Sequence, residues 1–333
     1  MKKHFFKEYN MRNVLCAGLF LFTLPFMTSC EKEEIQKESV DTLAELQKKV
    51  ASFVEENTVT ITDRKTELEN IAKRMISVEG GEFMMGAQAQ SEDKPNYDED
   101  ALSNESPVHK MTVKNFKIGQ FEVTQHDWLV VMGEYPQNFV KNVTSNIGSK
   151  NEELLKDILY FYGANRPIVF VTLDECQKFI DSLNVLTDSL LNLGNQKYRL
   201  PSEAEWEYVA RGGKNAKETV YAGANNISEV AWHRGNAYDV ENIGAEDYEN
   251  YRLHQVGKKR ANSLDIYDMS GNVSEWCGTY WAKYPNLNTS GDNYARRGGS
   301  WIQEASACRV SARDYGKAND FGATVGFRLA LSE

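Results

Sequence analysis

The C-terminal stretch RRGGSWIQEASACRVSARD, Arg296 to Asp314, holds a single cysteine, Cys308, among glycines, arginines and a tryptophan. A cysteine acts as a nucleophile or a soft metal ligand only as its thiolate. No CxxC pair, zinc-finger spacing or HExxH motif occurs in the 333 residues, and the five histidines are scattered. The stretch therefore raises the question of whether the Cys308 thiol does chemistry.

The stretch DMSGNVSEW, Asp268 to Trp276, is the best candidate for a metal site. Calcium prefers about six to eight hard oxygen ligands, and a glycine-containing loop lets several backbone carbonyls turn toward one point. The alternative is a capped turn in which Glu275 accepts hydrogen bonds from backbone N–H groups. Carboxylates at both ends of the loop favour the metal.

The first 29 residues predict an export signal. Basic residues precede an apolar run from Val14 to Met27, which has the length of a secretory signal core and is short for a membrane span. The run ends in Met-Thr-Ser-Cys, which resembles a bacterial lipobox, so we expect lipidation of Cys30 and an anchor in the outer membrane or at the cell surface. An ordinary signal peptide or an uncleaved anchor is the alternative. In each case the chain is exported.

The charge balance excludes one class of partner. The chain has 48 acidic and 38 basic residues, a net charge of −10, and no basic stripe. Nucleic acid is therefore not expected to bind.

Residues 30–75 predict a charged helical stalk. The segment lacks glycine and proline, and its apolar residues from Val40 to Val54 have helical spacing over about two heptads. A solvated stalk is the favoured interpretation, and a coiled-coil oligomer is the alternative.

The remaining residues, 76–333, predict one globular domain with short strands, long loops and few helices. Helices are expected over 124–132, 152–161 and 173–184. A further helix begins at YRLPSEAEWEYVARGG, where Ser202 and Glu205 have the spacing of a capping box. No βαβ alternation occurs, so a doubly wound sheet is disfavoured.

Seven blocks of this domain carry a resemblance to a known family. They are GGEFMMG (80–86), PVHKMTV to HDW (107–128), RPIVFVTLDEC (166–176), YRLPSEAEWEYVARGG (198–213), HQVGKKRANSLDIYDMSGNVSEW (254–276), RRGGSW (296–301) and GFRLAL (326–331). In this order they resemble the formylglycine-generating enzyme family, also called the sulfatase-modifying factor family. The resemblance implies an α+β, modified C-type-lectin fold, loop-rich, with small antiparallel sheets and two flanking helices.

The resemblance also implies ligands for two metals. The calcium loop of the family places side-chain ligands at Asp268 and Glu275 and carbonyl ligands at Gly271 and Val273, as a structural site. Family enzymes oxidise a substrate cysteine to formylglycine with oxygen and copper(I), which two cysteines five positions apart hold.

Aligning GGSW puts the second of those cysteines at Cys308 and the first at Gln303. An amide oxygen cannot replace a thiolate as a soft ligand. We therefore expect no copper site and no catalytic residues. Formylglycine-generating activity on a sulfatase cysteine is the alternative.

Cys308 has a second role by the same resemblance. Many non-catalytic relatives combine cysteines at the positions of Cys277 and Cys308, and an exported protein favours a disulfide between them. Such a bond would stabilise the fold by roughly 3–4 kcal/mol. The alternative is that both are buried reduced thiols.

The C-terminal segment resembles the variable region of lectin-like proteins that retroelements diversify. In those proteins framework residues hold the loops, and exposed positions between them contact a ligand. The positions that would form such a face here are Gln303, Glu304, Ser306, Asp314, Tyr315, Asn319 and Phe321. The alternative is that they are ordinary loop residues.

We therefore predict an exported, lipid-anchored, non-catalytic member of the family that binds a protein or glycan ligand through this face. A diversified lectin-like variable protein and a structural lipoprotein of an outer-membrane secretion or gliding complex are the alternatives.

Overall fold

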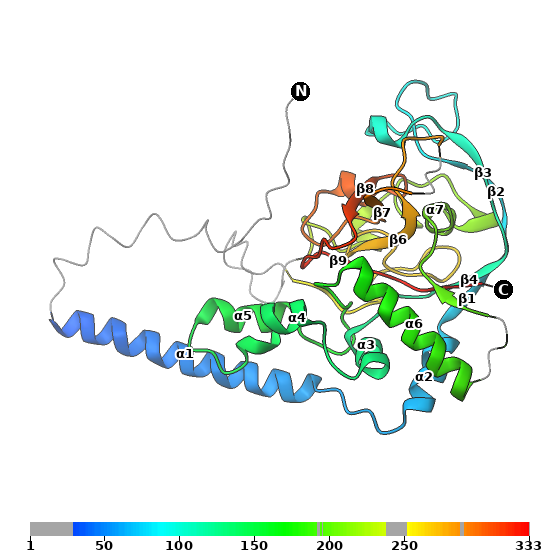
Figure 1. The fold of residues 1–333 in the computed structure, drawn as a ribbon. Helices are drawn as coiled ribbons and strands as arrows, with labels where there is room; N and C mark the ends of the chain where they lie inside the picture. The colour runs from blue at the N-terminus through cyan, green and yellow to red at the C-terminus, as the bar shows by residue number, and fades with distance from the viewer. Residues whose placement is uncertain (1–28, 192–193, 195, 238–251, 287–289, 333) are drawn as a thin grey trace. The chain divides into compact units, whose positions relative to one another are not determined.

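The computed structural model describes residues 29–191, 194, 196–237, 252–286 and 290–332 (Figure 1). The signal peptide predicted for residues 1–29 lies outside them up to residue 28. The chain divides into two compact units, Met1–Lys49 and Val50–Glu333. Helix α1 (Ser29–Asn57) covers the first part of the predicted stalk. No helix in the described part of the chain is long and apolar enough to cross a membrane.

The second half of the predicted stalk belongs to the globular unit. Helix α2 (Arg64–Lys73) begins at Asp63, whose carboxylate accepts hydrogen bonds from two backbone N–H groups of the first turn. Leu68 and Ile71, three residues apart, form one apolar stripe and are buried. Arg74 then pairs with Asp127 at 2.5 Å. In this structure, packing onto the domain therefore begins before the predicted boundary between residues 75 and 76.

Three small sheets form the domain. The first has the order β1 (Met75–Val78), β4 (Phe116–Gly119), β10 (Ala330–Ser332) and β5 (Tyr198–Arg199), all antiparallel. The second is the hairpin of β2 (Gly81–Met85) and β3 (His109–Val113). The third has the order β8 (Arg313–Lys317), β7 (Asn293–Arg297), β6 (Ser274–Tyr280) and β9 (Val325–Gly326), with β9 parallel to β6.

Four helices lie where the sequence predicts helices, although the one expected to end at residue 184 continues to Leu190. The short helices Gln137–Asn142 and Ile227–Val230 are not predicted. Helices α3 (Gln125–Met132) and α6 (Leu173–Leu190) begin at threonine caps, and α4 (Gln137–Asn142) and α5 (Glu152–Phe161) form the insertion. Helix α7 (Glu203–Ala210) has the predicted capping box of Ser202 and Glu205. The short helix α8 (Ile227–Val230) follows, and single 3-10 turns lie at Ser103–Glu105, Thr144–Asn146, Gly213–Asn215 and Ala305–Cys308.

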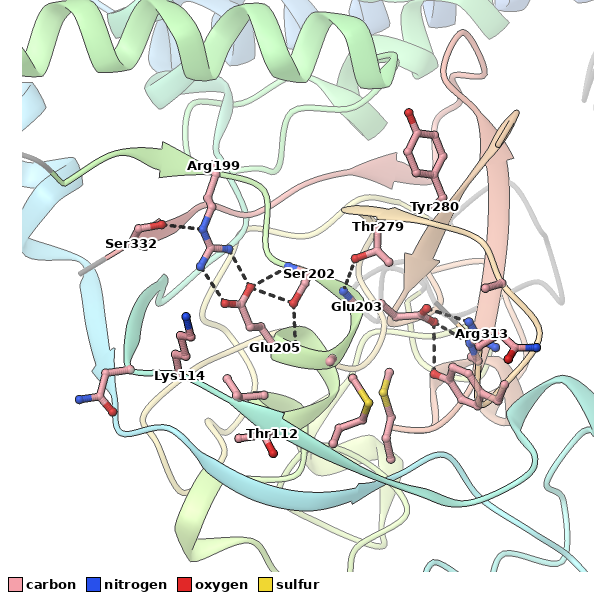
Figure 2. A pocket seen from close by; sticks show the side chains of 18 residues that line it. Thr112, Lys114, Arg199, Ser202, Glu203, Glu205, Thr279, Tyr280, Arg313 and Ser332 are labelled. Atoms are coloured by element: carbon pink, nitrogen blue, oxygen red, sulfur yellow. Dashed lines mark hydrogen bonds and ion pairs between the residues drawn. The ribbon is translucent and has the colours of Figure 1, made fainter. Parts of the chain in front are cut away.

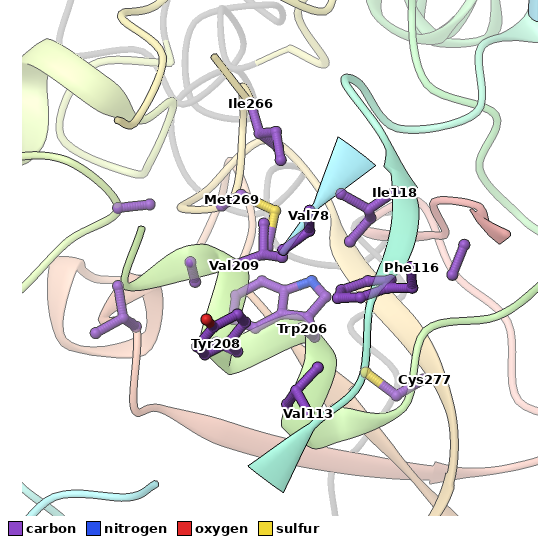
Figure 3. Packing of buried hydrophobic residues seen from close by; sticks show 14 of the residues in the cluster. Val78, Val113, Phe116, Ile118, Trp206, Tyr208, Val209, Ile266, Met269 and Cys277 are labelled. Atoms are coloured by element: carbon purple, nitrogen blue, oxygen red, sulfur yellow. The ribbon is translucent and has the colours of Figure 1, made fainter. Parts of the chain in front are cut away.

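Helix α7 lies at the centre of the core. Trp206 is fully buried among apolar side chains of β1, β3, β4 and β6, including Phe116 and Cys277 (Figure 3). Gly212, with φ of +100°, takes the left-handed conformation that lets the chain turn away after the helix. Strands from the N-terminal and the C-terminal parts of the domain therefore pack on one helix. Strands β6 and β7 lead from this core to the C-terminal loops.

Candidate functional site

Buried arginine–carboxylate pairs fix the C-terminal segment. Arg309 binds both oxygens of Glu105 at 2.7 and 2.9 Å. Arg313 binds both oxygens of Glu203 at 2.6 and 2.7 Å. Bidentate pairs of this kind hold a guanidinium in one orientation. The loops between these arginines are therefore anchored to earlier parts of the chain.

The two residues of the degenerate pair differ in exposure, since Gln303 is half-buried and Cys308 is buried. The Gln303 side chain accepts a hydrogen bond from Ser300 Oγ at 2.9 Å. The Cys308 thiol is fully buried, and burial raises its pKa to about 12. A thiol with this pKa is protonated at neutral pH, so it is a poor nucleophile and a poor soft ligand. Gln303 and Cys308 together provide no pair of thiolates.

The predicted disulfide between Cys277 and Cys308 is wrong for this structure, in which both residues and Cys176 are free, buried thiols. Cys277 lies on β6 and packs into the core beside Phe116 (Figure 3). Cys308 packs on the backbone at Gly299, where an added Cβ would lie 2.7 Å from its sulfur. Each sulfur therefore fills a different packed environment.

Asp268 of the predicted calcium loop has a carboxylate oxygen without a partner. Its Oδ2 accepts a hydrogen bond from the Gly257 N–H at 2.7 Å, whereas its buried Oδ1 has no hydrogen-bond partner within the described residues. Burial, followed by smaller opposing effects of neighbouring groups, raises the pKa of Asp268 to about 6. A buried anionic oxygen that accepts no hydrogen bond is costly, and a cation would satisfy it.

Glu275 is occupied by other partners. Arg328 binds its two oxygens at 2.6 and 2.7 Å, and the Trp206 Nε1–H donates to it at 2.7 Å. No group of three or more His, Cys, Asp or Glu side chains in the described part is placed to hold a metal ion. A calcium ion here would therefore depend on Asp268 and on backbone oxygens such as those of Gly271 and Val273.

Glu122 is a buried carboxylate beside this loop that sequence reasoning missed. Asn272 contacts its Oε2 at 3.5 Å, and its Oε1 has no partner within the described residues. Burial and the nearby Asp268 charge raise the pKa of Glu122 well above its usual value. The sequence gives no signal for it, because Glu122 stands between apolar residues in FEVTQ like any strand residue.

The turn at 303–306 is one part of the predicted binding face. The Gln303 carbonyl accepts from the Arg234 N–H at 3.0 Å, and the Glu304 carboxylate pairs with the Arg234 guanidinium at 3.0 Å. Glu304 and Ser306 are exposed, and Gln303 is half-buried. Arg234 therefore joins these residues to the segment after α8.

Strand β8 and the turn after it carry the other four predicted residues. Tyr315 is 48% exposed, and its ring packs on Trp281 with centroids 4.9 Å apart. Asp314 pairs with Arg296 at 2.8 Å. Consecutive strand residues point to opposite faces of a sheet, so Asp314 and Tyr315 cannot share one surface.

Asn319 and Phe321 are exposed on the turn after β8. The Phe170 N–H donates to the Gly322 carbonyl in this turn at 2.9 Å. The seven predicted residues are thus mostly exposed, but they form more than one surface and Asp314 lies apart from Tyr315.

Comparison with known proteins places this arrangement in a family. The chain is 32% identical to "Chaperone protein LppX" of Paenibacillus barcinonensis over 79% of this chain and 91% of that protein. It is 24% identical to the formylglycine-generating enzyme of Thermomonospora curvata over 79% and 94% of the two chains, and 25% identical to the inactive C-alpha-formylglycine-generating enzyme 2 of Bos taurus over 77% and 87%.

Among solved structures, Treponema denticola variable protein 1 has the same fold, with a TM-score of 0.56, 24% identity and coverage of 78% and 95% of the two chains. The profile of the sulfatase-modifying factor enzyme 1-like domain matches residues 61–333, a range that includes α2. The chain therefore belongs to the family of sulfatase-modifying factor enzyme 1-like domains.

Proposed function

We propose that this protein is an exported, lipid-anchored, non-catalytic member of its family that binds a protein partner through exposed C-terminal loops. The chain is about equally identical to an active enzyme and to an inactive relative, so overall identity does not distinguish the two. The question of catalysis therefore depends on the residues at the site. Gln303 in place of a thiolate and the buried, protonated Cys308 both argue against copper-dependent oxidation.

The observation that carries the binding proposal is the environment of Tyr315. Its ring is half exposed and packs at a tilt of 38° against Trp281. The Arg313 guanidinium also contacts Trp281, 4.1 Å from the ring centroid. Arg313 is in turn fixed by Glu203. An aromatic side chain held in one orientation before binding loses little entropy when a partner covers it.

Exposed apolar side chains favour a protein over a glycan as the ligand. Ile302 and Phe321, like Tyr315, are 40% or more exposed on the C-terminal loops. Large apolar and aromatic side chains are enriched at protein interfaces. A relative named as a chaperone, 32% identical over most of both chains, supports a protein client.

Photo-crosslinking in the native host tests this proposal. Benzoylphenylalanine replaces Tyr315, and in a matched control it replaces Val185, which is 69% exposed on α6. We expect a protease-sensitive adduct of discrete mass from position 315 only. Equal adducts from both positions, or none from 315, would contradict the proposal, and an adduct that only glycosidases remove would exclude a protein ligand.

We also propose that Asp268 binds a structural calcium ion, with carbonyl oxygens of Gly271 and Val273 completing the site. When bound, calcium would supply positive charge to the buried Asp268 oxygen. Glu275 would serve indirectly, because Arg328 and Trp206 already occupy it.

The lipid anchor at Cys30 is proposed from the lipobox-like sequence before it. Metabolic labelling with an alkyne fatty acid should modify the wild-type chain and not the Cys30→Ser variant. Equal labelling of both chains would contradict the anchor.

A further inference from the structure

A pocket that none of the predicted sites uses lies between β3, the first turn of α7 and the segment after β6 (Figure 2). Its volume of about 640 Å³ is within the range of small-molecule sites. Neither the seven predicted binding residues nor the four predicted calcium ligands line it. Any ligand of this pocket would therefore be separate from the proposed partner of the C-terminal loops.

The carboxylates in the pocket wall are already neutralised. At one end, Arg199 binds both oxygens of Glu205 at 2.7 Å. At the other end, the Glu203 carboxylate is held by Arg313 (Figure 2). Lys114 also lines the pocket, is exposed, and forms no ion pair with any residue of the described part. The positive charge of Lys114 is thus the one that the carboxylates of the pocket wall do not balance, although the protein as a whole is acidic.

Polar groups of the wall present donors to the pocket. Thr279 Oγ1 accepts from the Glu203 N–H at 3.0 Å, so its own O–H hydrogen remains to donate. Asn115 Oδ1 accepts from the Gly80 N–H at 2.9 Å, which leaves the amide NH₂ group to donate. Ser332 Oγ accepts from Arg199 Nε at 2.9 Å and likewise keeps its hydrogen. The wall is therefore rich in donors and suits a ligand rich in acceptor oxygens.

The pocket also has apolar surface. Met85 and Met111 line it, and so does Tyr284, whose ring is fixed between the Arg313 guanidinium at 3.5 Å and His109 at 4.5 Å. Methionine side chains adapt to irregular shapes. Such a surface can contact the C–H groups of a ligand whose oxygens meet the polar wall.

We propose that this pocket binds a hydroxylated organic acid such as an acidic sugar. Lys114 pairs with the carboxylate, and the donors of Thr279, Asn115 and Ser332 bind the hydroxyl oxygens. The methionine side chains contact the carbon skeleton. The proposal is independent of the function proposed for the C-terminal loops.

Ligand-observed NMR titrations with D-glucuronate test the proposal, with D-glucose and acetate as reference probes. The variants are Lys114→Met, Lys114→Arg and the control Lys110→Met. Lys110 lies on β3, which ends one residue before Lys114, and it pairs with Glu82 outside the pocket. Because a hydrogen bond to a charged group is lost, Lys114→Met should weaken glucuronate binding about tenfold or more. Lys114→Arg should retain most of it.

Glucose and acetate should each bind more weakly than glucuronate, because glucose lacks the carboxylate and acetate lacks the hydroxyl groups. Tyr315→Ala should leave glucuronate binding unchanged, which separates this pocket from the C-terminal loops. The proposal is wrong if the wild-type protein does not bind glucuronate, if acetate binds equally well, or if Lys110→Met or Tyr315→Ala weakens binding as much as Lys114→Met.

Discussion

Replacement of Arg328 by methionine tests how the buried charges hold the C-terminal segment. Arg328 is fully buried and pairs with both oxygens of Glu275. It also donates to the carbonyls of Gly119 and Tyr267 at 3.0 Å. Without the guanidinium, the Glu275 carboxylate stays buried, and among the described residues only the Trp206 N–H still donates to it.

Breaking one side of a buried ion pair costs about 3–5 kcal/mol, because the remaining charge is uncompensated. Arg328→Met should therefore lower the free energy of unfolding by about that amount. Urea unfolding followed by tryptophan fluorescence measures it. The control is Arg260→Met, which removes a pair with Glu229 in which both side chains are exposed and should cost less than about 1 kcal/mol.

The double variant Glu275→Gln with Arg328→Met separates charge from packing. Glutamine is neutral but keeps an acceptor for Trp206, so the double variant should recover a substantial part of the loss. The reasoning is refuted if Arg328→Met costs no more than Arg260→Met, or if the two single losses simply add in the double variant.

Three further predictions follow from named contacts. In the native protein Cys176, Cys277 and Cys308 should resist Ellman's reagent, and all three should react in denaturant without reductant. Reaction of only one of the three thiols in denaturant would instead indicate a disulfide between the other two. Burial, the largest effect, raises the pKa of Asp127, but the His126 hydrogen bond and Arg74 outweigh it and hold the pKa at about 2. Because the folded pKa lies below the unfolded one, Asp127→Asn should cost about 2 kcal/mol at neutral pH, and denaturation across pH should show that cost disappearing as pH falls from about 4 to 2. Calcium should raise the melting temperature of the wild-type protein and not of Asp268→Ala; equal responses would remove Asp268 from the metal site.

Local signals predict the helices of this protein well. The Ser202 and Glu205 capping box begins α7 where the sequence places it, because the hydrogen bonds of a cap join residues three positions apart. The α+β fold with small sheets is also correctly predicted, although β9 pairs parallel to β6. These features depend on short stretches of sequence or on the family resemblance.

Partners that are distant in sequence explain why the surroundings of the site residues could not be predicted. Glu275 has the right type and position for calcium, but Trp206 and Arg328, 69 and 53 residues away, occupy its carboxylate. The neighbours Asp314 and Tyr315 are assigned to one loop face, whereas their place on β8 turns them to opposite faces.

The most direct test of the central claim is the oxidation of a substrate cysteine. The purified protein, supplied with copper(I) and oxygen, is incubated with a peptide of the sulfatase motif, and mass spectrometry follows the peptide beside an active enzyme of the family. With Gln303 and the buried Cys308 as the degenerate pair, we expect the cysteine to remain unchanged. Conversion of that cysteine to formylglycine would contradict the account.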